Sequence, residues 1–137
     1  MRDELQHLLD GQPKPVCAKL TPFRIIDANL DVGSVRLEFA PQPAFGNHFG
    51  NVQGGFAVAM IDVLLSVCAF AKYRLWLPTA EIKTSFVEPL PIDTCVGEGK
   101  VIKAGRNLAF LEGSLLTADG RPAITASATA MVPPPRQ

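Results

Sequence analysis

The sequence is poor in charge of either sign, and what charge it has cancels. Thirteen basic and 13 acidic side chains among 137 residues give a formal net charge of zero. Neither the overall field nor a local cluster of Lys and Arg would hold a polyphosphate backbone. We therefore expect no nucleic acid partner.

Cysteine and histidine are too scarce for several kinds of site. Cys17, Cys68 and Cys95 are odd in number, far apart and without a CxxC pair, which fits reduced, packed thiols better than disulfides or a zinc site. Two histidines, His7 and His48, are too few for a Ser-His-Asp relay or a His-based metal site. No GxGxxG or GxxxxGK motif occurs. We expect no metal and no cofactor.

The chain also lacks a long uninterrupted apolar run. The longest covers residues 56–71 and is interrupted by Asp62 and Ser66, which is short of the ~20 residues of a membrane span. Its start, MRDELQHLLDGQ, is acidic and has no apolar segment of the kind that secretion signals carry. We expect a cytoplasmic protein that enters no membrane.

The apolar and turn patterns predict one α+β domain over residues 1–137. An apolar content of 47% is enough for a single core. Residues 1–19 are a short helix and lead-in, and 133–137 are a flexible tail. Between them the pattern predicts one helix of about twenty residues ending at Tyr73, and six strands. The expected strands are 23–30, 34–39, 79–87, 94–103, 107–117 and 121–132.

The long helix is apolar on nearly every side, which predicts burial on nearly every side. The rest of the chain must then wrap it. Small residues recur at every second position in two of the expected strands, so a helix could approach these strands closely. They are Gly97, Gly99, Ala126, Ala128 and Ala130. We therefore predict one largely antiparallel sheet curled around one helix.

Two features of this helix suggest that it carries catalytic groups. Gly54 and Gly55 open it, where the first N–H groups have no partner within the helix and suit an oxygen that gains negative charge. Asp62 is a carboxylate in apolar surroundings, which suits a general base. The glycines alone equally fit a tight turn, and the alternative for Asp62 is a structural carboxylate anchored by a neighbour such as Ser66, one turn later on the same face.

Spacing along the helix bears on how these groups would work together. Gly54 and Asp62 are eight residues apart, so the carboxylate lies roughly 12 Å along the helix from the Gly54 amide. One carbonyl cannot touch both. If both act on one bond, two antiparallel helices from two chains must face each other. This predicts a homodimer with two composite sites.

The segment Asn47 to Gly55, read with Asp62, resembles the hot-dog-fold acyl-CoA thioesterases of the phenylacetate-pathway (PaaI) type. The likeness covers roughly residues 20–132. It implies a hot-dog fold, an acyl-CoA substrate and frequent pairing of dimers into tetramers. It implies further that Asn47 and the Gly54 amide polarise the thioester carbonyl, and that Asp62 of the facing chain attacks it or activates water.

The same resemblance implies further site residues. Thr79 falls where the family often positions water, and the bend from Lys103 through Gly105 and Arg106 matches a basic turn that approaches coenzyme A. Gln53 stands where many members have histidine, and glutamine can donate a hydrogen bond but cannot become a cation. Apart from the resemblance, Gly55, His48 and Ser66 on the loop and helix are candidate substrate contacts, and His48 also fits a residue that only shapes the loop.

Two alternatives to hydrolysis stay open. A hot-dog dehydratase acting on a 3-hydroxyacyl thioester generally needs a histidine beside the acid, and Gln53 occupies the place where one is expected. A non-catalytic acyl-CoA binding protein or sensor would show tight binding without thiol release. The residues do not identify the acyl group, although several aromatic side chains could line an apolar pocket. These are Phe45, Phe49, Phe56 and Trp76.

Overall fold

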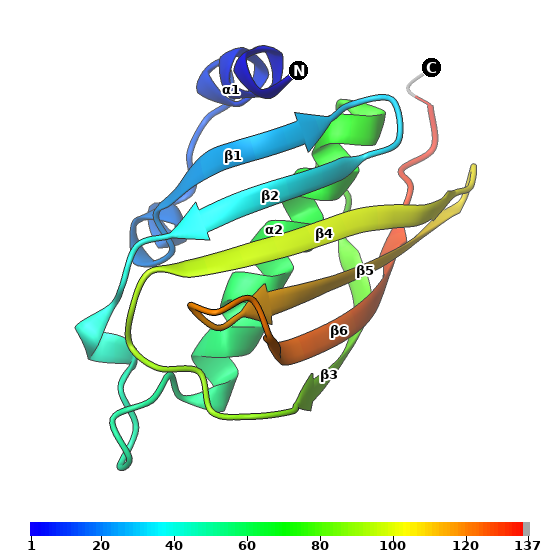
Figure 1. Cartoon of the computed structure of the whole chain (residues 1–137). Helices are drawn as coiled ribbons and strands as arrows, with labels where there is room; N and C mark the ends of the chain where they lie inside the picture. The colour runs from blue at the N-terminus through cyan, green and yellow to red at the C-terminus, as the bar shows by residue number, and fades with distance from the viewer. Residues whose placement is uncertain (136–137) are drawn as a thin grey trace.

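The computed structural model describes residues 1–135, and in it one long helix lies along one face of a single curved sheet (Figure 1). The predicted α+β class, long helix and six strands are confirmed. In chain order the elements are α1 (Arg2–Asp10), the 3-10 helix η1 (Val16–Leu20), β1 (Phe23–Asn29), β2 (Ser34–Phe39), the 3-10 helix η2 (Pro43–Phe45), α2 (Gly54–Tyr73), β3 (Thr79–Phe86), β4 (Cys95–Ala104), β5 (Leu108–Leu116) and β6 (Pro122–Met131).

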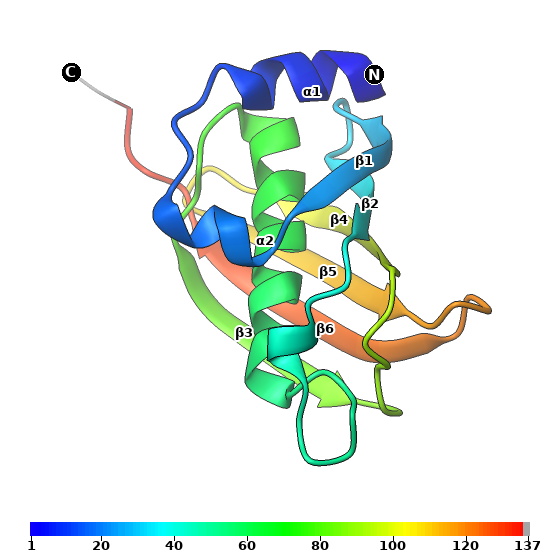
Figure 2. The ribbon, with the colours of Figure 1, turned by 90° about the vertical axis from the view of Figure 1, so that its left-hand side faces the viewer.

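The sheet is antiparallel throughout, in the order β1-β2-β4-β5-β6-β3. The strands β1 and β3 therefore form its two edges. Helix α1 packs against β1, whereas within residues 1–135 the outer edge of β3 pairs with no strand. Figure 2 shows β3 running along α2 at the far side of the curve from β1. An eight-residue strand with one free edge is a ready template for pairing with another chain.

The core lies between α2 and the sheet, and two glycines of β4 allow them to approach. A Cβ atom on Gly99 would stand 2.9 Å from the Cys68 sulfur, and one on Gly97 would stand 3.2 Å from a methyl of Leu64. Real side chains do not tolerate the first of these distances without displacement of the neighbour. The prediction that a helix packs closely on these positions is confirmed.

Helix α2 is not buried on nearly every side, and this expectation was wrong. Gly55, Ala59, Asp62, Val63 and Ser66 are partly or fully exposed, and their spacing of three and four residues places them on one side of the helix. We call these five residues the uncovered stripe. The sheet of one chain covers only the opposite side, and an apolar sequence does not distinguish burial within a chain from burial against a partner.

Helix α2 is also long and apolar enough, by length and composition alone, to cross a membrane. However, 56% of its most apolar window is buried inside the domain, so it is the core helix of this fold. Of the predicted flexible tail at 133–137, residues 136 and 137 lie outside the described residues.

The three cysteines are free, but they are not all packed. Cys68 and Cys95 are buried, and loss of solvent raises the pKa of their thiols to about 12 and about 11, respectively. Cys17 is exposed on η1, so the prediction of a packed thiol was wrong there. The short 3-10 helix lies at the surface and leaves this side chain in solvent.

Candidate active site

Asp62 and Thr79 are brought together from two elements. The Thr79 hydroxyl, at the first residue of β3, donates a 2.8 Å hydrogen bond to Asp62 Oδ1 on α2. Within residues 1–135, Asp62 has this partner and no hydrogen bond to Ser66. The anchor of the carboxylate is thus a strand hydroxyl rather than the serine one turn away. The other carboxylate oxygen remains available on the uncovered stripe.

The N-terminus of α2 presents unpaired donors. Gln53 caps the helix, since its Oε1 accepts a 3.3 Å hydrogen bond from the Phe56 N–H. A Cβ on Gly55 would stand 3.0 Å from that same oxygen, so glycine leaves room for the cap. The N–H groups of Gly54 and Gly55 donate to no acceptor within residues 1–135. They lie at the positive end of the helix macrodipole and can donate hydrogen bonds to a ligand oxygen.

The loop before α2 is organised by Asn47. Its Oδ1 accepts hydrogen bonds from the N–H groups of Phe49 at 2.9 Å and Asn51 at 3.1 Å, which leaves its amide NH2 as the available donor. The Gln53 N–H donates to the Phe45 carbonyl at 2.8 Å and ties this loop to the helix start. In Figure 2 the loop extends beyond the first turn of α2. His48 is exposed on it.

Phe86 lies beside Gly54, and nothing in the sequence signalled this proximity. A Cβ atom on Gly54 would stand 3.3 Å from two ring atoms of Phe86. The ring is nevertheless 55% exposed. Phe86 ends β3 and Thr79 begins it, so α2 and β3 run in opposite directions with Gly54 beside Phe86 and Asp62 beside Thr79. Within one chain, Gly54 and Asp62 stay about 12 Å apart along the helix.

The basic bend between β4 and β5 is fixed to the C-terminal end of α2. The Tyr73 hydroxyl donates a 2.8 Å hydrogen bond to the Gly105 carbonyl, and desolvation raises the pKa of Tyr73. A Cβ on Gly105 would stand 2.5 Å from the Leu108 carbonyl oxygen, which excludes larger residues. Lys103 and Arg106 are exposed on the bend. The bend lies about 16 Å along α2 from Asp62. The role of Tyr73 was not predicted.

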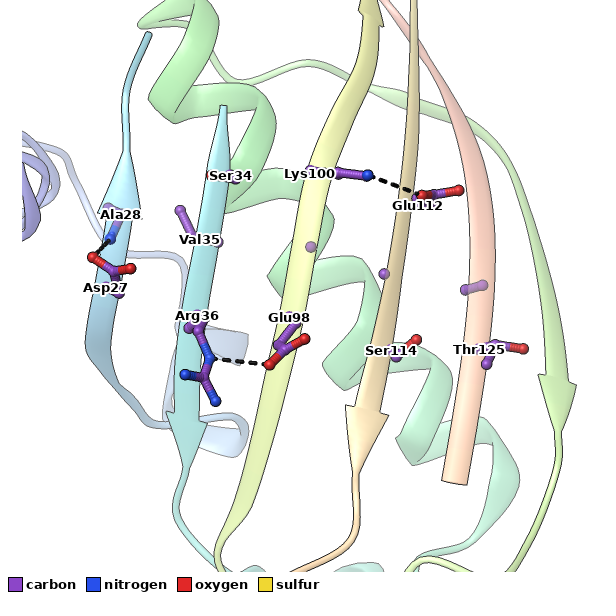
Figure 3. A pocket seen from close by; sticks show the side chains of 13 residues that line it. Asp27, Ala28, Ser34, Val35, Arg36, Glu98, Lys100, Glu112, Ser114 and Thr125 are labelled. Atoms are coloured by element: carbon purple, nitrogen blue, oxygen red, sulfur yellow. Dashed lines mark hydrogen bonds and ion pairs between the residues drawn. The ribbon is translucent and has the colours of Figure 1, made fainter. Parts of the chain in front are cut away.

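A hollow of about 620 Å³ lies elsewhere, on the face of the sheet away from α2 (Figure 3). Its floor carries cross-strand ion pairs, Arg36 with Glu98 at 3.1 Å and Lys100 with Glu112 at 3.6 Å. No predicted site residue lines it. Exposed pairs of this kind each contribute at most about 1 kcal/mol. Among the described residues, no three His, Cys, Asp or Glu side chains gather where they could hold a metal ion.

Comparison with known proteins identifies similar chains. The family model of the thioesterase superfamily matches residues 49–124. A solved structure from Ralstonia eutropha JMP134, described as a thioesterase related to phenylacetic acid degradation, is 30% identical with a TM-score of 0.82, over 93% of this chain and 98% of that chain. A protein of Saccharolobus solfataricus described as an esterase is 27% identical over 103 residues, 72% of this chain and 74% of that protein.

A third similar protein carries a ligand. A hypothetical thioesterase of Streptococcus pneumoniae TIGR4, solved with coenzyme A, has a TM-score of 0.74 at 18% identity, over 85% of this chain and 92% of that chain. Such low identity establishes likeness of fold alone. Together with the first match, it confirms the predicted hot-dog fold.

Proposed function

Because the chain belongs to the thioesterase superfamily, we propose that it hydrolyses an acyl-CoA thioester to a carboxylic acid and free coenzyme A. The observation that carries the proposal is the Asp62 carboxylate, held by the Thr79 hydroxyl at 2.8 Å on the uncovered stripe. A carboxylate held in one orientation, with an oxygen left over, suits a base or a nucleophile. The proposed reaction uses no metal and no redox cofactor.

The proposed chemistry has two variants that share their outcome. Either Asp62 takes a proton from a water that attacks the thioester carbon, or its carboxylate attacks that carbon and water hydrolyses the resulting anhydride. In both, the carbonyl oxygen gains negative charge and is stabilised by the Gly54 N–H, with the Asn47 amide NH2 as second donor. The carbon–sulfur bond breaks and coenzyme A leaves as the thiolate, which takes up a proton.

Gln53 has a limited part in this scheme. Its Oε1 caps α2 through Phe56, so its amide NH2 is the group left to donate a hydrogen bond to the departing sulfur. A neutral amide stabilises a thiolate less than a charged imidazolium would. The scheme therefore depends on the intrinsic ease with which a thiolate leaves.

We propose that each site is composite, with Gly54 from one chain and Asp62 from its partner. The unpaired edge of β3 supports this arrangement. If two β3 strands pair antiparallel about a twofold axis through their middles, Thr79 of one chain lies opposite Phe86 of the other. Since Thr79 holds Asp62 and Phe86 lies beside Gly54, the same operation brings each Asp62 toward the other chain's Gly54.

The uncovered stripe supports the same dimer independently. Gly55, Ala59 and Ser66 are small residues on one side of α2, which allows a second α2 to approach closely. An antiparallel partner helix crossing near the middle of the segment 54–62 would place Asp62 against the start of the other helix. The strand edge and the helix stripe are therefore compatible with one twofold axis.

The basic bend suits the other end of the substrate. Lys103 and Arg106 are exposed about 16 Å along α2 from Asp62, and the long pantetheine arm of coenzyme A separates its thioester from its phosphates. We therefore propose that these two side chains pair with the phosphates. The hypothetical thioesterase from Streptococcus pneumoniae, which shares this fold, was solved with coenzyme A.

Thiol release tests the proposal. We expect Asp62→Asn to lower turnover of acyl-CoA esters by at least about 100-fold, measured across aryl, medium-chain and long-chain substrates. Asp31→Asn, at an exposed turn acid, is the matched control and should keep full turnover. Unchanged turnover in Asp62→Asn would refute the role of Asp62. If wild-type protein binds acyl-CoA tightly by calorimetry yet releases no thiol, the chain is a binding protein instead.

A further inference from the structure

We infer that Phe86 is the residue that limits the size of the acyl group, because its ring occupies the space next to the amide that receives the thioester carbonyl. This inference rests on the proposed function. It specifies the substrate class as thioesters of compact apolar acids rather than long-chain acids.

The position of the ring carries the inference. A single methyl group added at Gly54 would already lie 3.3 Å from two atoms of the Phe86 ring, which is tighter than most side-chain contacts. A carbonyl oxygen bound by the Gly54 N–H therefore places the first carbons of its acyl chain near this ring. An extended chain could continue past it only if the ring moved.

Much of the Phe86 ring is left uncovered by its own chain. A phenyl ring that is 55% exposed at the end of a strand contributes little to the core of its own chain. In the proposed dimer it lies opposite the partner's Thr79, and therefore beside the carboxylate that Thr79 orients. The ring would then contact both halves of one composite site.

A second aromatic surface lies in the first turn of α2. Phe56 is 40% exposed and stacks on the buried Phe45, with ring centroids 4.3 Å apart and planes 8° apart. The stack fixes the Phe56 ring, whereas the Phe86 ring stacks on no other aromatic ring among the described residues. Phe86 is thus the one that sets the depth of the subsite, while Phe56 provides a rigid apolar surface.

Substitution of Phe86 tests the inference by selectivity rather than by activity. Phe86→Ala should raise the ratio of kcat/KM for decanoyl-CoA over butyryl-CoA by about tenfold or more, and Phe86→Leu should give a smaller rise. Phe110→Ala is the matched control, because Phe110 is an exposed phenylalanine (42%) on β5, away from Gly54. Its ratio should stay within about twofold of wild type.

A binding measurement separates this inference from the proposed hydrolysis. Ketone analogues of butyryl-CoA and decanoyl-CoA, with a CH2 group between sulfur and carbonyl, keep the carbonyl but have no thioester bond to hydrolyse, and calorimetry gives their affinities directly. We expect Phe86→Ala to raise the affinity for the decanoyl analogue relative to the butyryl analogue by about tenfold. If the wild-type protein releases thiol from none of the acyl-CoA esters but Phe86→Ala still shifts the affinity ratio, the proposed hydrolysis is overturned and the inference about Phe86 stands. Chain-length ratios that stay unchanged in Phe86→Ala, or a uniform loss that accompanies dissociation to monomers, would overturn the inference about Phe86.

Discussion

The hydrogen bond from Thr79 to Asp62 allows a quantitative prediction for Thr79→Val, which replaces the hydroxyl with a methyl of the same shape. A hydrogen bond to a charged group contributes about 1.5–3 kcal/mol. Within one chain Thr79 is exposed and Asp62 is only partly buried. We therefore use the lower end of this range, about 1.5 kcal/mol, for their hydrogen bond. A loss of about 1.5 kcal/mol in transition-state stabilisation corresponds to about a tenfold fall in kcat/KM.

The assay follows thiol release from one acyl-CoA with wild type, Thr79→Val and Thr79→Ser. The serine variant keeps the hydroxyl and should stay within about threefold of wild type. Thermal unfolding should show little change for either variant, since Thr79 is exposed at the start of an edge strand. A Thr79→Val enzyme with kcat/KM within about twofold of wild type would refute the view that this hydroxyl orients the base.

Three further predictions concern the core, the thiols and the basic bend. Gly99→Ala should destabilise the fold by about 1–3 kcal/mol in urea unfolding, because its Cβ would stand 2.9 Å from the Cys68 sulfur. Burial raises the pKa of the Cys68 thiol to about 12. The buried thiol therefore stabilises the fold fully below the unfolded thiol pKa of about 9, and this stabilisation is lost as pH rises toward 12, at up to about 1.4 kcal/mol per pH unit. Cys68→Ala should reduce the loss of unfolding free energy at alkaline pH, whereas Cys17→Ala should not. Lys103→Gln with Arg106→Gln should raise KM for acyl-CoA but not for the matching acyl-pantetheine, which lacks the phosphates, and equal effects on both would contradict phosphate contact.

Much of the fold was predictable because its local signals agree. The long apolar helix after Gln53-Gly54-Gly55, and the Asp119-Gly120 turn before the last strand, are strong signals of element type. The small side chains of β4 correctly predicted close packing on α2. These features depend on residues near one another in sequence or on a simple repeat.

The candidate site was predictable only in part, because its contacts are made between distant segments. Asp62 and Gly54 were found from their position on one helix, whereas the nearness of Phe86 to Gly54 depends on the path of β3 alongside α2. The exposure of the helix stripe was missed for a related reason. Apolar composition reports that a surface avoids water, but not whether the same chain or a partner covers it.

Mixed dimers test the composite site most directly. Gly54→Pro removes the oxyanion N–H at the first helical position, where proline is tolerated, and Gln53 has the extended conformation, φ −64° and ψ 140°, that suits the residue before proline. Gly54→Ala, which keeps the N–H, is its control. Asp62→Asn removes the base. Gly54→Pro and Asp62→Asn should each be nearly inactive on their own.

When the two inactive variants are exchanged into one dimer, one of its two sites regains both Gly54 and Asp62. We predict that such a mixed dimer recovers about half of the wild-type turnover. If mass measurement shows that mixed dimers have formed and the preparation remains as inactive as its parents, the two groups do not act across a subunit interface, and the proposed site is wrong.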